Sequence, residues 1–416
     1  MKKIAVIGSG LSGCLTAFKI GRKFPKYQIY LIDSSNNILQ SMKSIRMGNL
    51  RFNNGFHALD VDRCRDLYNF LKNALKVKFK VIATSRYLMI GDNIIKENQK
   101  IINYPLNLRN EFLKKSIVTS NINTLYKNIS KKLQLLIQRV SKRYSNNLND
   151  NLKHFIPWFL PSEYYLKSND EGDIYRNNIR KINKETLLAV PKNGLFESLI
   201  FYFKNEFKKI KNIKLMLGTK VFFENKNIIL RKNDKILNLN FDNTFICTSS
   251  MIMIDREKKI FNEILSNQKY FISCVVSSKF LTNINFSEIL CLNNDFIEFS
   301  RVSNIIKKNN RHFFLIELTF KSIEDLDKKL NKVRLQKILK PLFIDKAKSV
   351  KVIDYKVTRK MFFPKKIKIK QATKYVEKFI NNISTKKNIV FYNINFGPIN
   401  MAKAWIASEN NLRLLK

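Results

Sequence analysis

The sequence of 416 residues predicts an α/β protein in which helices flank a parallel sheet. Three observations near the start of the chain support this class. Lys2–Ile7 is a compact apolar run, as expected of a strand buried on both faces of a parallel sheet. A glycine-rich turn follows, and apolar positions then continue at helical spacing from about Leu11. A second apolar run, Gln28–Ile32, predicts the next strand and completes a Rossmann-like βαβ unit.

The glycine spacing indicates what this unit binds. Gly8, Gly10 and Gly13 fall in the G-x-G-x-x-G register, and Asp33 ends the second strand 20 residues after Gly13. In this context the first glycine permits a tight turn, the second lets a pyrophosphate approach the backbone, and the third lets the helix pack on the sheet. The first N–H groups of the helix would donate to phosphate oxygens.

The acidic residue at the end of the second strand would bind a sugar. Asp33 would accept hydrogen bonds from the adenosine ribose of a dinucleotide, and a carboxylate there disfavours the 2′-phosphate of NADP. We therefore expect cofactor contacts from Gly8, Ser9, Gly10, Leu11, Ser12, Gly13, Asp33 and Ser34.

The same N-terminal residues have a second interpretation. A short basic start, an apolar stretch and the letters LSGC resemble a lipoprotein signal in which Cys14 is acylated. Such a signal needs neither the second strand nor Asp33, and its apolar core would be short and broken by glycines. The dinucleotide interpretation is therefore favoured, and we expect Cys14 to lie unmodified in the helix of a cytoplasmic protein.

Length and composition set further limits. A chain of 416 residues can bury a large core and is typical of two domains. The longest charge-free stretch, Asn388–Ala402, is shorter than the roughly 20 apolar residues that cross a membrane, so we predict no transmembrane segment. The five cysteines are scattered without a C-x-x-C pair, which predicts neither a metal site nor a disulfide framework.

The formal net charge of +45 admits three explanations. Lysines are spread along the whole chain together with abundant Asn and Ile, which is typical of an AT-rich genome. An anionic small-molecule substrate or contact with an anionic membrane surface remains an alternative. No nucleic-acid-binding motif is present, so we expect no nucleic-acid partner. The sequence does not predict the oligomeric state.

Later segments return to helix and strand. We predict a helix over Leu195–Lys208, a strand around Lys214–Phe223 with a hairpin to Leu239, and strands within 270–320. The last segment predicts a strand, a Gly-Pro turn and an amphipathic helix. This order predicts a discontinuous dinucleotide-binding domain of residues 1–75, 190–255 and 355–416, with an α+β substrate domain of residues 76–189 and 256–354 inserted in it.

Several separated stretches together resemble the flavin-dependent amine oxidase and protoporphyrinogen oxidase superfamily, which includes UDP-galactopyranose mutase. Their order along nearly the whole chain carries the resemblance. They are VIGSGLSG with Asp33, FNNGFHALD (52–60), VPKNGLFESLIFYF (190–203), LGTKVFF (217–223), DNTFICTSS (242–250), FSRVSN (299–304) and GPINMAKAWIAS (397–408). The chain departs from the superfamily in lacking a Gly-Gly pair soon after Asp33 and an acidic residue before the terminal turn.

The resemblance implies that the cofactor is FAD, held by a Rossmann-like domain of the FAD/NAD(P)-binding type. It implies that the strand containing Val221 contacts the adenine and that Gly397, Asn400 and Met401 contact the flavin. A helix that begins near Asn400 would stabilise the negative charge of reduced flavin with its N-terminus. The alternative is an ordinary docking helix with Trp405 in the core.

Two residues are candidates for catalysis. His57, one of three histidines, lies in the stretch that resembles the flavin-facing segment, where it would tune the flavin or shuttle a proton. Arg301 lies in a stretch similar to the mutase strand that presents an arginine to a diphosphate, and its planar fork suits phosphate or carboxylate. The alternatives are a hydrogen-bonded structural histidine and a solvated strand arginine.

The resemblance therefore implies an FAD-dependent oxidoreductase that acts on a small metabolite, with a sugar nucleotide or a surface-glycan precursor as candidates. A redox-neutral flavoenzyme of the UDP-galactopyranose mutase type and a non-catalytic binding module with a flavoprotein fold are the alternatives. No Ser/His/Asp triad or paired-carboxylate pattern stands out, so the flavin would carry the chemistry.

Overall fold

The structure is a computed structural model of the whole chain. It describes residues 1–53, 58–62, 64–90, 93–96, 186–224, 227–248, 268–278, 286–291, 299–308, 311–320, 351–362, 369–392 and 401–415, with short pieces between residues 102 and 166 and residue 333.

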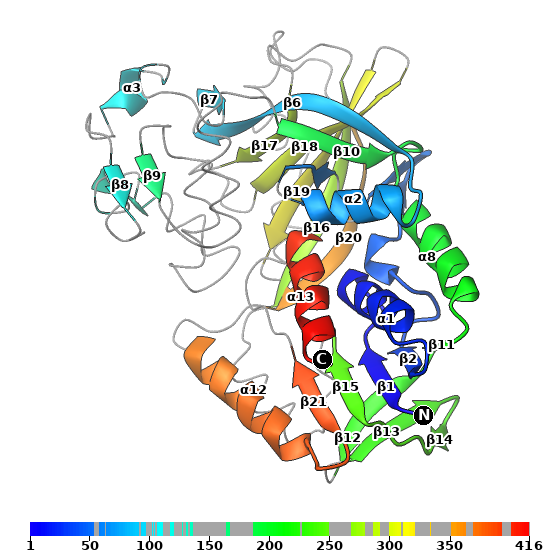
Figure 1. Cartoon of the computed structure of the whole chain (residues 1–416). Coiled ribbons are helices and arrows are strands. Elements are labelled where there is room, and N and C mark those ends of the chain that lie inside the picture. Colours follow the sequence, from blue (N-terminus) through cyan, green and yellow to red (C-terminus); the bar gives the residue numbers. More distant parts are fainter. Residues whose placement is uncertain are drawn as a thin grey trace.

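A parallel sheet forms the base of the fold (Figure 1). Within the described residues it has five strands in the order β11-β2-β1-β15-β21, and every neighbouring pair is parallel. The strands are β1 (Lys3–Ile7), β2 (Gln28–Asp33), β11 (Ile213–Leu217), β15 (Asn243–Ile246) and β21 (Ile389–Tyr392). The α/β class predicted from the sequence is confirmed, and three of its strands join the first two from distant parts of the chain.

Side chains alternate between the two faces of this sheet, and each face is covered. Ile4 and Val6 pack against helices on one face, whereas Ala5 and Ile7 pack on the other. The first face is covered by α1 (Leu11–Lys23), α2 (Arg65–Asn73), α8 (Ser198–Lys209) and α13 (Met401–Arg413). The second is covered by the antiparallel strands β12 (Lys220–Glu224), β13 (Asn227–Lys232) and β14 (Lys235–Leu237) and by α12 (Ile369–Ile383). Burial on both faces explains why β1 and β2 are continuous apolar runs.

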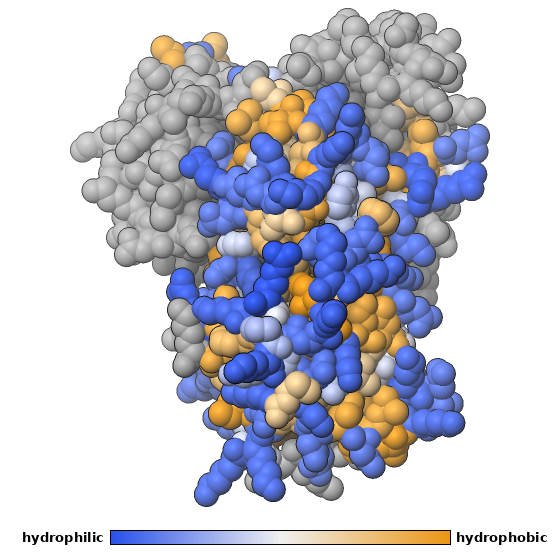
Figure 2. Space-filling model, turned by 45° about the vertical axis from the view of Figure 1, so that its right-hand side comes forward, coloured by the Kyte–Doolittle hydropathy of each residue, from blue (hydrophilic) through white to orange (hydrophobic). Residues whose placement is uncertain are grey.

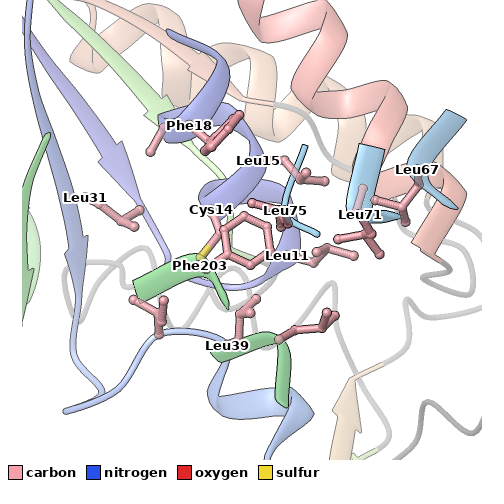
Figure 3. Close-up of a cluster of buried hydrophobic side chains, with 14 of the residues drawn as sticks. Leu11, Cys14, Leu15, Phe18, Leu31, Leu39, Leu67, Leu71, Leu75 and Phe203 are labelled. Atoms are coloured by element: carbon pink, nitrogen blue, oxygen red, sulfur yellow. The ribbon is translucent and has the colours of Figure 1, made fainter. Parts of the chain in front are cut away.

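The helix side of the core fixes the position of α1. Leu11, Leu15 and Phe18 lie among Leu67, Leu71 and Leu75 of the α2 region and Phe203 of α8 (Figure 3). Each fully buried leucine or phenylalanine contributes about 1.5–3 kcal/mol relative to an exposed one. The helix that follows the glycine turn is therefore held rigidly against the sheet.

A larger mixed sheet lies beyond the carboxyl ends of the parallel strands, in the upper part of Figure 1. Nine strands of the described chain form it, in the order β20-β16-β19-β18-β17-β6-β10-β5 with β7 paired to β6. Its strands are β5 (Leu59–Asp60), β6 (Phe79–Ile90), β7 (Asn93–Lys96), β10 (Thr186–Pro191), β16 (Gln268–Ser278), β17 (Phe286–Cys291), β18 (Phe299–Lys308), β19 (Arg311–Phe320) and β20 (Lys351–Phe362).

Smaller elements complete the described chain. They are η1 (Gln40–Met42), the hairpin β3 (Ile45–Met47) and β4 (Leu50–Phe52), α3 (Leu106–Arg109), and the pair β8 (Ile117–Thr119) and β9 (Tyr164–Leu166). Met47 and Phe52 of the hairpin pack against Leu315 of β19, so the hairpin contacts the larger sheet. The predicted domain boundaries stay a prediction.

One predicted strand is wrong in a way that matters for the site. The run Lys214–Phe223 is two strands, because Gly218 adopts a φ of +69° and ends β11. The chain then leaves the parallel sheet and begins β12 in the antiparallel layer, with the N–H of Thr219 donating to the carbonyl of Asp33 at 2.8 Å. The predicted helix Leu195–Lys208 is confirmed as α8, which begins three residues later, at Ser198.

Among the described residues, no helix is long and apolar enough to cross a membrane. Within the same part of the chain, no three His, Cys, Asp or Glu side chains lie close enough together to hold a metal ion. Hydrophilic side chains are spread over the described part of one face, with smaller hydrophobic areas between them (Figure 2).

Candidate dinucleotide-binding site

The three glycines between β1 and α1 occupy different surroundings. Gly8 has a φ of +98°, and a Cβ there would lie 2.9 Å from the Cβ of Thr248. A Cβ on Gly13 would lie 1.8 Å from the carbonyl oxygen of Gly8. A Cβ on Gly10 would have no described atom within 4 Å. Gly8 and Gly13 are therefore required by close packing, whereas Gly10 borders open space into which a ligand can approach the backbone.

The N-terminus of α1 begins at this open space. Gly10 is the N-cap in an extended conformation, with no capping hydrogen bond from a side chain of the described residues. The first turn of α1 contains no acidic residue. Because the first N–H groups of a helix lack intrahelical partners and lie at the positive end of its dipole, this end can hold an anion.

Asp33, at the carboxyl end of β2, ties the glycine turn to the next loop. Its carboxylate accepts a hydrogen bond from the N–H of Ser9 at 2.5 Å and another from the N–H of Ser35 at 2.7 Å. Ser9 is buried, whereas Ser34, which lies between Asp33 and Ser35 in the sequence, is exposed. Each carboxylate oxygen can accept more than one hydrogen bond, so Asp33 can hold the loop and still accept from a ribose hydroxyl.

We expect Asp33→Ala to weaken ADP binding by about tenfold or more, because ribose hydrogen bonds worth about 1 kcal/mol each are lost and the Ser9 turn is loosened. Titration of the full-length protein with ADP measures this. Asp33→Asn is the matched control: it keeps the size of the side chain and one acceptor oxygen, so its loss should be smaller. Equal ADP affinity in all three proteins would remove Asp33 from the site.

Leu39 is a residue of this region that the sequence did not single out. It is fully buried and left-handed, with φ 52° and ψ 35°, and its N–H donates to the carbonyl of Ser9 at 2.8 Å. The left-handed conformation costs a non-glycine residue about 1–2 kcal/mol. Its side chain packs beside Cys14 and Phe203 in Figure 3, and this burial offsets the cost. No local sequence signal marks a left-handed leucine.

The strand predicted to contact the adenine lies next to Asp33 through the Gly218 turn. The side chain of Val221 in β12 is buried in the core beneath the sheet. Of the described strands, only β13 pairs with β12. A contact from Val221 to a ligand would therefore use the backbone at the free edge of β12 and not the side chain.

The C-terminal helix begins where the sequence predicted. α13 starts at Met401, which is buried in the same cluster as Leu11 and Leu39. Trp405, one turn later, packs against Phe70 of α2 with ring centroids 5.3 Å apart. Both the flavin-contacting and the docking interpretation of this helix agree with these contacts. Gly397 and Asn400 lie outside the described residues.

Two cysteines lie close behind the glycine turn. The Cys14 thiol donates to the carbonyl of Ser9 at 3.2 Å, and Cys247 follows β15. Burial raises the pKa of Cys14 well above its usual value and the pKa of Cys247 to about 11. Both thiols are therefore protonated near neutral pH and are poor nucleophiles. Cys14 is a packing residue of α1 in this structure.

The described residues do not test the two predicted catalytic side chains. His57 lies outside them. The preceding Asn53 is buried, accepts from the N–H of Phe196 at 2.7 Å and donates to the carbonyl of Gly194 at 2.9 Å, which joins two of the stretches behind the family resemblance. The backbone of Arg301 lies in β18, in register with Glu317 of β19. The roles of His57 and Arg301 stay predictions.

The chain was compared with known protein families, curated proteins and solved structures. Residues 6–74 match the NAD(P)-binding Rossmann-like domain family. No curated protein matches the chain by sequence. Reduced UDP-galactopyranose mutase superposes over 100% of this chain and 96% of its own, at 10% identity and a TM-score of 0.63. A protein from Exiguobacterium sp. 255-15 named as a protoporphyrinogen oxidase superposes over 100% and 98%, at 10% identity and a TM-score of 0.61.

A double mutant of putrescine oxidase with redesigned cofactor binding superposes over 100% of this chain and 99% of its own, at 8% identity and a TM-score of 0.62. The chain shares the fold of these three structures over its whole length. In this fold a Rossmann-like domain is combined with a second sheet, so the resemblance inferred from the ordered stretches is confirmed at the level of the fold.

Proposed function

We propose that this protein is an FAD-dependent oxidoreductase that acts on a small metabolite. The observation that carries the proposal is the open space at Gly10, one residue from the Ser9–Asp33 contact. It borders the N-terminus of α1, which no side chain of the described residues caps. It occurs in a chain that shares the amine oxidase-like fold over its whole length.

The described residues suit the adenosine diphosphate part of FAD. Backbone N–H groups of the turn Ser9–Gly13 would hold the pyrophosphate, Asp33 the ribose, and the backbone at Val221 the adenine. Gly397, Asn400 and Met401 would hold the flavin end, where the start of α13 offers the positive end of a helix dipole. When bound, FAD supplies a hydride acceptor and donor.

Proton transfer and substrate orientation would be carried out by side chains of this protein. His57 would hold or move a proton near the reacting atoms, and Arg301 would orient an anionic group of the substrate through its planar fork. A sugar nucleotide or a surface-glycan precursor carries such groups and is the substrate class that we favour. The carboxylate of Asp33 disfavours NADP in the same pocket.

A redox-neutral isomerase is the second candidate. The whole-chain superposition on reduced UDP-galactopyranose mutase supports it, as do the stretch NNGFHALD and Arg301. A non-catalytic binding module is the third candidate, supported by the missing Gly-Gly pair after Asp33 and the missing acidic residue before the terminal turn.

A substrate panel under anaerobic conditions distinguishes the three. Nucleotide sugars, amines and alcohols are mixed with the oxidised and with the dithionite-reduced protein, while flavin absorbance and products are followed. Bleaching of the oxidised flavin by a substrate is the result expected of an oxidoreductase. Isomerisation that occurs only after reduction would assign the mutase reaction instead. Bound flavin without response to any substrate would favour the binding module.

A further inference from the structure

The C-terminal helix is fastened to the dinucleotide-binding helix by a buried lysine. Lys19 of α1 is 9% exposed. Its Nζ donates to the Oγ of Ser408 at 2.7 Å and to the Oε1 of Glu409 at 2.5 Å. The same nitrogen lies 3.2 Å from the ring centroid of Trp405, in a cation–π arrangement. One side chain of α1 therefore contacts two successive turns of α13.

A second polar contact lies further along α13. The Nδ2 of Asn411 donates to the Oγ1 of Thr16 at 3.1 Å and approaches the Sγ of Cys247 at 3.5 Å. Thr16 is on α1, and Cys247 follows β15. The two sets of contacts fix both the rotation of α13 about its axis and its height along α1, which apolar packing alone leaves free to adjust.

Burying the charged ammonium group of Lys19 costs free energy, because the group is removed from water. Burial lowers the pKa of Lys19, and the Glu409 carboxylate opposes that shift. Apolar side chains of similar volume often replace buried ion pairs without loss of stability, whereas polar contacts have directional requirements. The Lys19 contacts are therefore better explained by placement of α13 than by stability.

The placement of α13 bears on the proposed cofactor site. β1, β15 and β21 are adjacent and parallel, so their carboxyl ends lie at one edge of the sheet. α1 follows β1 and α13 follows β21, and Leu11 and Met401 at their starts belong to one buried cluster. A dinucleotide with its pyrophosphate at α1 would extend along this edge past the start of α13.

We propose that Lys19 is a positioning residue for the flavin end of the cofactor. By fixing α13 on α1, it sets the distance between the two helix N-termini, of which α1 would hold the pyrophosphate and α13 the flavin of one FAD molecule. The proposal rests on the proposed FAD binding. It assigns Lys19 no contact with the cofactor.

The test compares two ligands of different length on full-length protein stripped of cofactor. ADP reaches only the glycine turn and Asp33, whereas FAD also reaches α13. For Lys19→Met we expect ADP affinity close to that of the unsubstituted protein and FAD affinity lower by about tenfold or more. Lys19→Arg should restore most of the FAD affinity, because a guanidinium can lie over Trp405 and still donate to Glu409.

Arg22→Met is the matched control. It removes the same charge from the same helix and breaks the 2.9 Å ion pair between Arg22 and Glu206 of α8. It leaves α13 untouched, so both affinities should stay unchanged. Ser408→Ala, which removes a single acceptor, should lower FAD affinity by about fivefold at constant ADP affinity, and it provides a test if Lys19→Met does not fold.

Two results would overturn the proposal. One is an unchanged ratio of FAD to ADP affinity in folded Lys19→Met, or in Ser408→Ala where Lys19→Met does not fold. The other is an equal loss of both affinities, which would show that Lys19 supports the glycine turn. An unsubstituted protein that binds FAD no tighter than ADP would instead contradict the proposed function.

Discussion

We expect Gly10→Val to abolish dinucleotide binding while the protein remains folded. A Cβ at Gly10 would have no atom of the described chain within 4 Å, and Gly10 has a φ of −65°, which any L-residue adopts. A valine side chain would therefore begin with a Cβ that meets no described protein atom, in the space that a pyrophosphate needs. Titration with ADP and FAD measures the loss, and circular dichroism with thermal unfolding checks the fold.

Gly10→Ala is the graded control for this substitution. One methyl group fills less of the space, so residual binding should lie between those of the unsubstituted protein and Gly10→Val. The thermal midpoint should hardly change in either variant, since substitutions that meet no neighbours usually alter stability by about 0.5 kcal/mol or less. Full cofactor occupancy in Gly10→Val would show that the pyrophosphate lies elsewhere.

Gly13→Ala should destabilise the fold itself, in contrast to Gly10→Val. The new Cβ would lie 1.8 Å from the carbonyl oxygen and 3.0 Å from the carbonyl carbon of Gly8, so one backbone segment must move. Gly8 is held by its N–H donating to the carbonyl of Ile32 at 2.8 Å and is crowded by Thr248 on the other side. We expect a loss of about 3 kcal/mol or more of unfolding free energy, at or above the upper end for overpacking, measured by chemical denaturation.

Gly21→Ala, in the same helix, separates this clash from a general effect of alanine. A Cβ on Gly21 would lie 2.7 Å from the Cδ1 and 2.8 Å from the Cγ1 of Ile213, so a side chain and not the backbone would have to move. Alanine also favours the helix over glycine by up to about 1 kcal/mol, so the loss of unfolding free energy should be smaller than for Gly13→Ala. Equal stability of the Gly13→Ala and Gly21→Ala variants would contradict the close packing of Gly13 against Gly8.

The first βαβ unit was predictable from sequence because its signals are local. Apolar runs, three glycines at fixed spacing and Asp33 predict both strands and the start of the helix. The predicted bounds of β1 and β2 and the predicted start of α1 agree with the structure to within a residue or two. The two strands within Lys214–Phe223 could not be separated in this way. Both are apolar enough for a sheet, and their separation depends on the left-handed Gly218, which lies against Asn36 of another loop.

Contacts between distant segments could not be predicted from the sequence, because no local signal marks them. Lys19 looks like a solvated helix residue in sequence, yet the partners that bury it lie in α13, nearly the whole chain away. Leu39 adopts a conformation that its residue type disfavours, and only the surrounding core explains it. The family resemblance predicted the fold from the order of short stretches, while His57, Gly397, Asn400 and the side chain of Arg301 stay predictions.

The identity of the bound cofactor decides whether the glycine turn and Asp33 belong to an FAD site. The purified protein is denatured, and the released small molecule is identified by its absorbance spectrum and its mass, with the amount compared with that of the chain. We expect FAD, one molecule per chain, in the protein as isolated or after reconstitution. Release of NAD, or a colourless protein that cannot be reconstituted with FAD, would contradict it.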